Sequence, residues 1–349
     1  MNDLKWIRII LIIIAVPIIV IVLKELKTVF IPLIFAGFLS FLFSPMLKAL
    51  SKRKVPVFVS IILVFFILLL FIALLSGVIY ASYTSFVDQL PKYQEKFTQM
   101  LEGGYVWFED TARYMNLAFE KLPLFSGAEI MPETHFSITK LLSGTMNFFG
   151  ELGTYIFLIL IYLLFLVAGS AKFENRIRNS LSESRSAQAL ATMLNIESQI
   201  QKYFINKSII SLGTALTGML WLGLLQVDFV IISGTLLFVL NFIPNIGSIV
   251  ASLFPILICL VDYGFGWRVI LVAVSMLLTQ ITFANIIEPK FMGERMNLSP
   301  IVILISLIFW GWVWGIVGMM LAVPITSTLN IILKQIDKTN IISMVISDE

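Results

Sequence analysis

The chain is poor in the residues that build redox, metal and hydrolytic sites. Its 349 residues include one cysteine, Cys259, and one histidine, His135. A single cysteine excludes a disulfide within the chain and any cysteine-rich metal site, and a single histidine argues against zinc. We therefore predict no metal and no cofactor. His135 lies in a polar segment and is interpreted as an ordinary surface histidine.

Charge is also scarce. Only 13% of the residues are charged, against about 25% in soluble domains, while 59% are hydrophobic and the mean hydropathy is +0.97. The formal net charge of +3 is too small to indicate a nucleic-acid partner. These values predict an all-α polytopic membrane protein whose main partner is the lipid bilayer.

Several sequence motifs of enzymes and ATP-driven machines are missing. The sequence contains no GxxxxGK[ST], no HExxH and no GxSxG pattern. We therefore expect no enzyme. Any transport is expected to be driven by an ion gradient or by the gradient of the solute itself.

Long hydrophobic runs are abundant. About eight segments approach the roughly 20 apolar residues of a membrane helix: 6–23, 28–47, 56–80, 150–169, 207–225, 228–261, 267–288 and 300–333. The segments 228–261 and 300–333 are too long for one simple span and contain helix breakers, so each is predicted to form half-helices or a hairpin. Asp228 and Asp262 flank the first of these and are expected to be hydrated. No cleavage site follows the first run, which is therefore interpreted as an attached helix rather than a signal peptide.

Basic residues predict the orientation. Most connection lysines and arginines fall in alternate connections, at the N-terminus and in 48–54, 170–207 and 289–298. Under the positive-inside rule these regions are cytoplasmic, so the N-terminus is predicted inside a bacterial inner membrane. Residues 81–149 would then lie outside.

The same layout predicts six parts of the chain. They are a three-helix membrane part (1–80), an extracytoplasmic amphipathic helical segment (81–149), a fourth membrane helix (150–169), a cytoplasmic amphipathic segment (170–206), a C-terminal membrane part (207–335) and a tail (336–349). Pro91 suits a first helical turn, and Gly103-Gly104 is expected to interrupt that helix. Within 184–206, an apolar helix face is expected to lie along the bilayer.

Segment 228–261 contains the most unusual stretch, with Asn241, Pro244, Asn245 and Gly247 in its middle. Pro244 lacks an N–H and disfavours helix in the preceding residue, and Gly247 permits a positive φ. Irregular backbone at membrane depth persists only if it is buried in protein or lines a wet cavity. A proline kink alone would not need two asparagines. We therefore predict a substrate-binding site at this broken helix.

Polar residues in the seventh segment extend this candidate site. Gln280, Asn285 and Glu288 fall within roughly a 140° arc of a helix. Because ionisable groups near membrane depth are functional candidates, Glu288 is the candidate carrier of a coupling proton or cation. The alternative is that Glu288 lies at the interface and pairs with Lys290 or Arg295.

The last segment repeats some of these features. Gly311, Gly315 and Gly318 have spacings that permit close helix contact, and a second broken helix is the alternative. A loose likeness between residues 247–255 and 315–324 suggests an internal repeat.

Three stretches resemble a known family. They are "QIQKYFINKSIISL" (199–212), "LNFIPNIGSIVASLFP" (240–255) and "IIEPKFMGERMNLSPIVILISLIFWGWVWGIVGMMLAVPITSTLNIIL" (286–333). They resemble the autoinducer-2 exporter family of bacterial inner-membrane permeases, and the N-terminal half agrees in length and span layout. The resemblance implies about eight membrane segments, a homo-oligomer, and export of the quorum-sensing signal autoinducer-2. Other members are associated with sodium- or lithium-proton exchange.

Three functions follow as hypotheses. The first is a secondary transporter, an exporter or permease for a small polar solute such as autoinducer-2. The second is a sodium (lithium)/proton antiporter, which usually needs a carboxylate well inside the bilayer. The third is a non-transporting scaffold that docks through its outer helices, and it leaves the broken helix at 241–247 unexplained.

Overall fold

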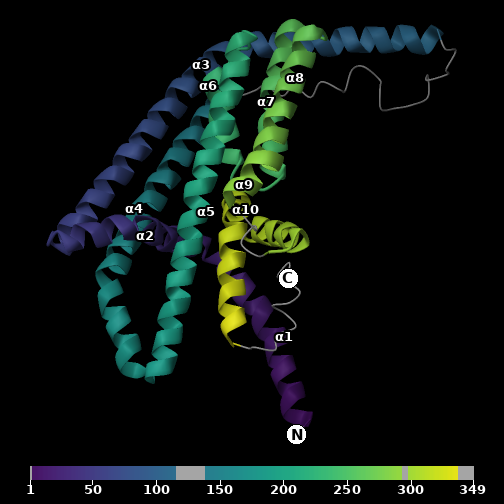
Figure 1. Ribbon diagram of the computed structural model, residues 1–349. Helices are drawn as coiled ribbons and strands as arrows, with labels where there is room; N and C mark the ends of the chain where they lie inside the picture. The colour runs from purple at the N-terminus through teal and green to yellow at the C-terminus, as the bar shows by residue number, and fades with distance from the viewer. Residues whose placement is uncertain (1, 115–137, 293–297, 337–349) are drawn as a thin grey trace.

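The computed structural model describes residues 2–114, 138–292 and 298–336, and these residues are helical with no strand (Figure 1). The helices are α1 (Asn2–Glu25), α2 (Lys27–Lys52), α3 (Val57–Tyr114), α4 (Ile138–Ser180), α5 (Glu183–Leu224), α6 (Val230–Leu240), α7 (Ile246–Tyr263), α8 (Trp267–Gln280), the π-helix η2 (Ile281–Ile287), α9 (Glu288–Met292) and α10 (Pro300–Ile336). The all-α prediction is confirmed. His135 lies outside the described residues.

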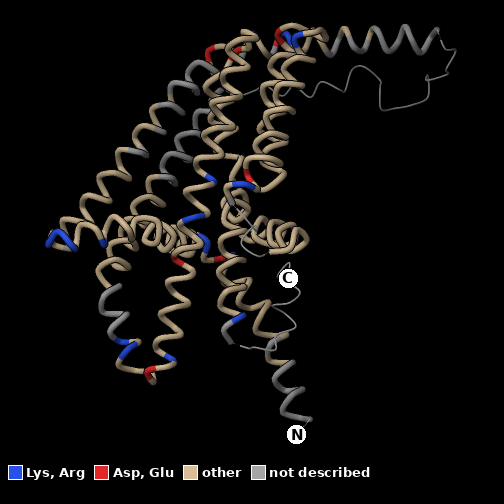
Figure 2. The backbone as a smooth tube through the Cα atoms, viewed as in Figure 1, with Lys and Arg blue, Asp and Glu red and all other residues tan. Residues whose placement is uncertain are grey.

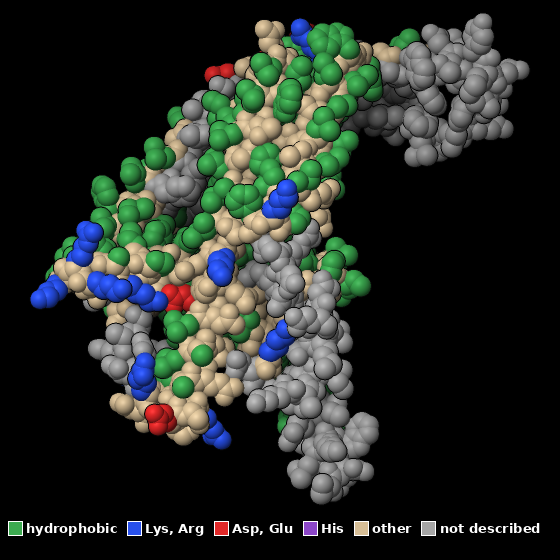
Figure 3. All heavy atoms as spheres, in the orientation of Figure 1, with side chains coloured by type: hydrophobic (Ala, Val, Ile, Leu, Met, Phe, Trp, Pro, Cys, Tyr) green, Lys and Arg blue, Asp and Glu red, His purple; other side chains and the backbone are tan. Residues whose placement is uncertain are grey.

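Five helical segments within the described residues are long and apolar enough to cross a membrane: Lys27–Lys52, Glu183–Leu224, Ile246–Tyr263, Trp267–Phe291 and Pro300–Lys334. Shorter apolar stretches lie in α3, α4 and α6. Large apolar side chains are exposed along most of these helices. Figure 3 shows them spread over the upper part of the molecule, with lysine and arginine mainly below. A surface of this kind suits contact with lipid chains rather than water.

The long segment 228–261 forms a helical hairpin. The helices α6 and α7 pack against each other and are joined by a turn at 241–245. With 11 residues, α6 is only about 16 Å long, too short to cross a hydrocarbon core of about 30 Å. Tyr93 hydrogen-bonds both Asp228, which precedes α6, and Asp262, near the end of α7. The two ends of the hairpin therefore lie side by side. The predicted break is confirmed.

The second long segment is broken as well. Within α10, Gly315 has φ 65° and ψ −144°, which is not helical. Three residues later, the backbone of Gly318 packs against the carbonyl group of Trp310. Gly315 therefore makes the predicted break in the helix, and Gly318 permits the predicted close contact, here between the two halves of α10. In Figure 1 the second half of α10 turns away from the first.

The helix α3 differs from the prediction. It continues from Val57 to Tyr114, so the expected boundary between residues 80 and 81 falls inside one helix. Pro91 lies in its interior rather than in a first turn, and Gly103-Gly104 does not interrupt it. A proline bends a long helix without ending it when the neighbouring turns keep their hydrogen bonds. Figure 1 shows α3 rising along one side and then turning across the upper end of α6 and α7.

The helix α5 also crosses an expected boundary, because it continues unbroken from Glu183 to Leu224. The helix predicted in 184–206 is present, but its apolar face does not face the bilayer. Ile200 and Tyr203 are buried in clusters with residues of α2 and α10. The apolar face packs there because it finds apolar partners inside the protein.

The base of the hairpin is tied to α3 by a polar cluster. Lys96 Nζ lies 2.7 Å from Asp262, whose side chain is only 7% exposed, and the Tyr93 hydroxyl is 2.9 Å from Asp228. Lys92 is more distant, at 3.9 and 4.0 Å from the two carboxylates. The expectation of a hydrated Asp262 is wrong, whereas Asp228 is 44% exposed.

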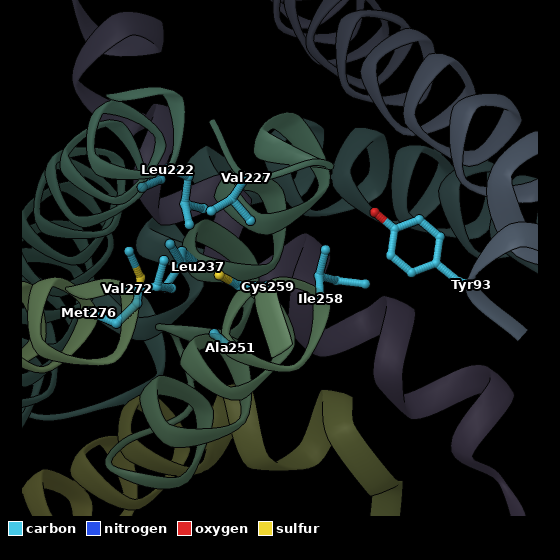
Figure 4. Close-up of a cluster of buried hydrophobic side chains, with 10 residues drawn as sticks. Tyr93, Leu222, Val227, Leu237, Ala251, Ile258, Cys259, Val272 and Met276 are labelled. Atoms are coloured by element: carbon cyan, nitrogen blue, oxygen red, sulfur yellow. The ribbon is translucent and has the colours of Figure 1, made fainter. Parts of the chain in front are cut away.

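The phenol at the centre of this cluster stays a hydrogen-bond donor. Burial raises the pKa of Tyr93 well above its usual value, and hydrogen bonds to Asp262 and Asp228 raise it further. Figure 4 shows Tyr93 reaching from α3 toward the hydrophobic core formed by the hairpin, α5 and α8, which contains Leu237, Ala251 and Cys259.

The distribution of charge agrees with two distinct ends. Figure 2 shows lysine and arginine at the α2–α3 and α4–α5 connections, in the lower part of the view, where the N-terminus also lies. The bent end of α3 lies at the top. Which end faces the cytoplasm stays a prediction.

Candidate functional site

A cavity of about 410 Å³ lies beside the turn of the α6–α7 hairpin. Its wall comes from α5, the hairpin, the α8–η2–α9 segment and α10. The lining residues are Tyr203, Lys207, Asn241, Pro244, Asn245, Ser248, Ile249, Gln280, Ile281, Ala284, Asn285, Glu288, Pro300, Ile303 and Val323.

Six of the seven residues singled out from the sequence line this one cavity. They are Asn241, Pro244, Asn245, Gln280, Asn285 and Glu288. Gly247 does not line it. Instead, Gly247 is buried in the turn, where its Cα packs against the carbonyl group of Leu240. Gly247 therefore shapes the turn rather than presenting a surface to a solute.

Asn241 joins the hairpin turn to its surroundings. It is 4% exposed, its Nδ2 donates to Ser211 Oγ at 3.1 Å, and its Oδ1 accepts from Ser248 Oγ at 3.2 Å. One amide therefore connects the end of α6 to both α5 and α7. These bonds satisfy the buried side-chain amide of Asn241 and tie the turn to both neighbouring helices.

Asn245 has a different role in the same turn. Its φ is 59° and its ψ is −55°, so the positive φ that Gly247 permits occurs here instead. With Ile246 N–H donating to Pro244 O at 2.6 Å, residues 244–246 form a γ-turn, which is a rare and strained turn. Although Asn245 stands at the N-cap position of α7, its side chain makes no capping hydrogen bond. The side chain is exposed at the cavity, and its amide can therefore face a solute.

Gln280 and Tyr203 bring two unsatisfied polar atoms to the wall. Gln280 Nε2 donates to Ser252 Oγ at 3.2 Å, while Gln280 Oε1 is buried and has no partner among the described residues. The buried Tyr203 hydroxyl likewise has none among them. Buried polar groups without partners are costly, and a solute that bonds to them offsets that cost.

The π-helix η2 carries the third side of the cavity. It spans Ile281–Ile287, between Gln280 and Glu288, and Asn285 is exposed on it. Such π-turns inside α-helices are rare and occur frequently at functional sites. The prediction that Gln280, Asn285 and Glu288 share one side agrees with their common cavity, although it assumed a regular α-helix.

Glu288 pairs with a residue that the sequence analysis missed. Both of its carboxylate oxygens lie 3.0 Å from Lys207 Nζ. The expected partners were Lys290 and Arg295. Instead, the pair joins α5 to the start of α9.

Lys207 was counted among the basic residues of a cytoplasmic connection, yet its side chain is only 4% exposed. A spacing of four residues connects Tyr203, Lys207 and Ser211, and this spacing places them on one helix face. All three are buried. That polar stripe within an apolar helix was the signal that could have identified both Tyr203 and Lys207.

The wall therefore offers amides, hydroxyls and a closed ion pair around an open space. Amides and hydroxyls are groups that can hydrogen-bond a small polar molecule. Within the described ranges, no group of three or more His, Cys, Asp or Glu residues could hold a metal ion. Cys259 is fully buried in the hydrophobic core of the hairpin, not in the cavity wall.

The chain is similar to several bacterial transport proteins. A putative transport protein of Haemophilus influenzae is 30% identical over 97% of this chain and 95% of its own. The AI-2 transport protein TqsA of Escherichia coli K12 is 28% identical over 92% of this chain and 90% of its own. The putative transport protein YueF of Bacillus subtilis is 24% identical, covering 87% and 83% respectively.

The sequence pattern described as AI-2E family transporter matches residues 9–338, which is nearly the whole chain. This match covers all the helices that form the cavity. With its all-helical fold and its apolar helices long enough to cross a membrane, the chain belongs to the AI-2E transporter family of multi-pass membrane proteins.

Proposed function

We propose that the protein is a secondary transporter that exports a small polar solute such as autoinducer-2, and that the cavity beside the hairpin turn is its solute site. The observation that carries this proposal is the convergence of Asn245, Gln280 and Asn285 on one cavity at a break in the helical structure. A relative named for AI-2 transport supports the choice of solute.

The cavity suggests how a solute is held. Gln280 Oε1 accepts from a solute hydroxyl, and the Tyr203 hydroxyl donates to a solute oxygen, because neither atom has another partner among the described residues. The Asn245 and Asn285 amides stand on the exposed part of the wall and meet the solute first. Transporters commonly place such sites where membrane helices are interrupted.

The sodium (lithium)/proton antiporter gains no support. Its coupling carboxylate would be Glu288, but both oxygens of Glu288 already contact Lys207. A sodium ion there would have to displace an ammonium group. The relatives described above are named for transport without mention of a cation. We retain Glu288 as the residue that would carry a proton if export is proton-driven. A homo-oligomer and a cytoplasmic N-terminus remain predictions.

We expect Asn245→Ala and Asn285→Ala each to lower export of autoinducer-2. Losing one hydrogen bond of about 0.5–1.5 kcal/mol corresponds to roughly a two- to tenfold loss, and the double variant should lose about tenfold or more. The measurement is autoinducer-2 released by cells that express the variants at matched levels.

Thr235→Ala is the control. Among the described residues, the Thr235 hydroxyl bonds only to its own helix, at Ile231 O, and Thr235 does not line the cavity. Export by this variant should match the wild type. If the double variant Asn245→Ala/Asn285→Ala also exports like the wild type, the cavity is not the solute site.

A further inference from the structure

The cavity wall contains one cation and one anion, and they are held together. Lys207 Nζ lies 3.0 Å from both oxygens of Glu288, with 4% and 19% of the two side chains exposed. A lone charge buried in such a place is costly, whereas a closed pair compensates both charges. The two residues come from helices far apart in the sequence, so the fold itself brings the charges together.

Among the residues that the structure describes, the rest of the wall adds no formal charge. Apart from the pair, the lining residues are apolar or carry amides and hydroxyls. The described wall is therefore formally neutral although it contains two ionisable side chains. An anionic solute meets no free cation there, and a cationic solute meets no free carboxylate. Either ion would have to open the pair or lose its hydration without meeting an opposite charge.

We infer that Lys207, through its pairing with Glu288, sets the charge selectivity of the cavity and excludes solutes that carry a net charge. This inference rests on the proposed function, because it takes the cavity as the solute site. Lys207 is thus a specificity-determining residue of the cavity, whereas the sequence alone predicts a basic residue that marks the cytoplasmic side. Breaking the pair on one side should raise the relative flux of the ion whose charge is opposite to the charge that remains.

The test is transport by the purified full chain in vesicles, with three probes of similar size. They are neutral dihydroxypentanedione, anionic ribonate and cationic 1-amino-1-deoxyribitol. For the wild type we expect the neutral probe to be carried at least about tenfold faster than either ion. Glu288→Gln leaves the ammonium of Lys207 and should raise the flux of ribonate relative to the neutral probe about tenfold. Lys207→Gln leaves the carboxylate of Glu288 and should raise the flux of the amine relative to the neutral probe about tenfold.

The double variant Lys207→Gln/Glu288→Gln is the decisive control. It removes both charges, so the cavity is neutral again and both ions should be excluded as in the wild type. If the single variants rank the three probes as the wild type does, or if the double variant admits the ion that a single variant admits, the inference is wrong.

A further variant avoids disturbing the buried pair. Asn285→Asp adds one negative charge at an exposed position of the wall, which the fold should tolerate. It should raise the flux of the amine relative to the neutral probe even if the single charge variants fail to fold. An unchanged ranking in this variant would show that net charge does not control selectivity.

The outcomes also separate this inference from the proposed function. If Asn245→Ala/Asn285→Ala loses transport of the neutral probe while all charge variants keep the wild-type ranking, only the inference fails. If the wild type carries no dihydroxypentanedione, the proposed solute is wrong. The ribonate-to-amine ratios of the variants then still decide the role of Lys207.

Discussion

Gly247→Ala is expected to prevent the α6–α7 turn from closing. An added Cβ would overlap the carbonyl oxygen of Leu240 far inside van der Waals contact and lie 3.0 Å from the Cβ of Ile243. The obstacle is backbone, which cannot rotate away as a side chain can. The cost should therefore exceed the roughly 1–3 kcal/mol typical of overpacking.

The measurement is thermal unfolding of the purified protein in detergent. A loss of about 3 kcal/mol lowers Tm by roughly 6–12 °C on the scale of soluble domains of 150–250 residues. The control is Gly223→Ala in α5, where an added Cβ meets no atom within 4 Å. Alanine is the better helix former there, so its Tm should stay level or rise. A Gly247→Ala protein with wild-type Tm would contradict the tight turn.

Asp262→Asn should release the base of the hairpin from α3. The change removes the carboxylate that Lys96 contacts at 2.7 Å and that Tyr93 also hydrogen-bonds. Hydrogen bonds to charged groups contribute about 1.5–3 kcal/mol. Because Lys96 is one-third exposed and can be hydrated after the change, we expect a loss within that range rather than the roughly 3–5 kcal/mol of a fully buried pair.

Two further variants calibrate this result by the same thermal measurement. Tyr93→Phe removes one phenol and should cost less than Asp262→Asn, since Lys96 still holds Asp262. Lys92→Met should change Tm least, because Lys92 is half-exposed and its contacts with the carboxylates are long, at 3.9 and 4.0 Å. If Lys92→Met destabilises as much as Asp262→Asn, the cluster does not act through the short contacts.

The stabilisation from the hydrogen bonds of Tyr93 to Asp228 and Asp262 should not change in mild alkali. The pKa of Tyr93 is raised by burial first and by the two carboxylates second. A raised pKa means that the stabilisation is fully present below the unfolded value, about 10, and is lost only as the pH rises through the higher folded value. The Tm difference between wild type and Tyr93→Phe should therefore stay constant between pH 7 and pH 9.

Much of the candidate site could be predicted because its signals are local. Pro244 lacks an N–H and disfavours helix in the preceding residue, and Asn241 and Asn245 are turn-forming residues, so the turn between α6 and α7 could be predicted from the sequence. Gln280 and Asn285 stand out as polar residues in an apolar segment. Gly247 permits a positive φ, yet the positive φ of this turn occurs at Asn245, because glycine permits that conformation without requiring it.

The sequence alone determined the membrane class, the helical fold and the two broken segments, because hydropathy and backbone preferences act over a few neighbouring residues. The tertiary structure decided which distant residues meet. Lys207 and Glu288 are 81 positions apart, and Tyr93 and Asp262 are 169 apart. No local pattern encodes such pairs, since they depend on how whole helices pack. Packing alone turned Lys207 from an apparent surface charge into a buried residue of the cavity.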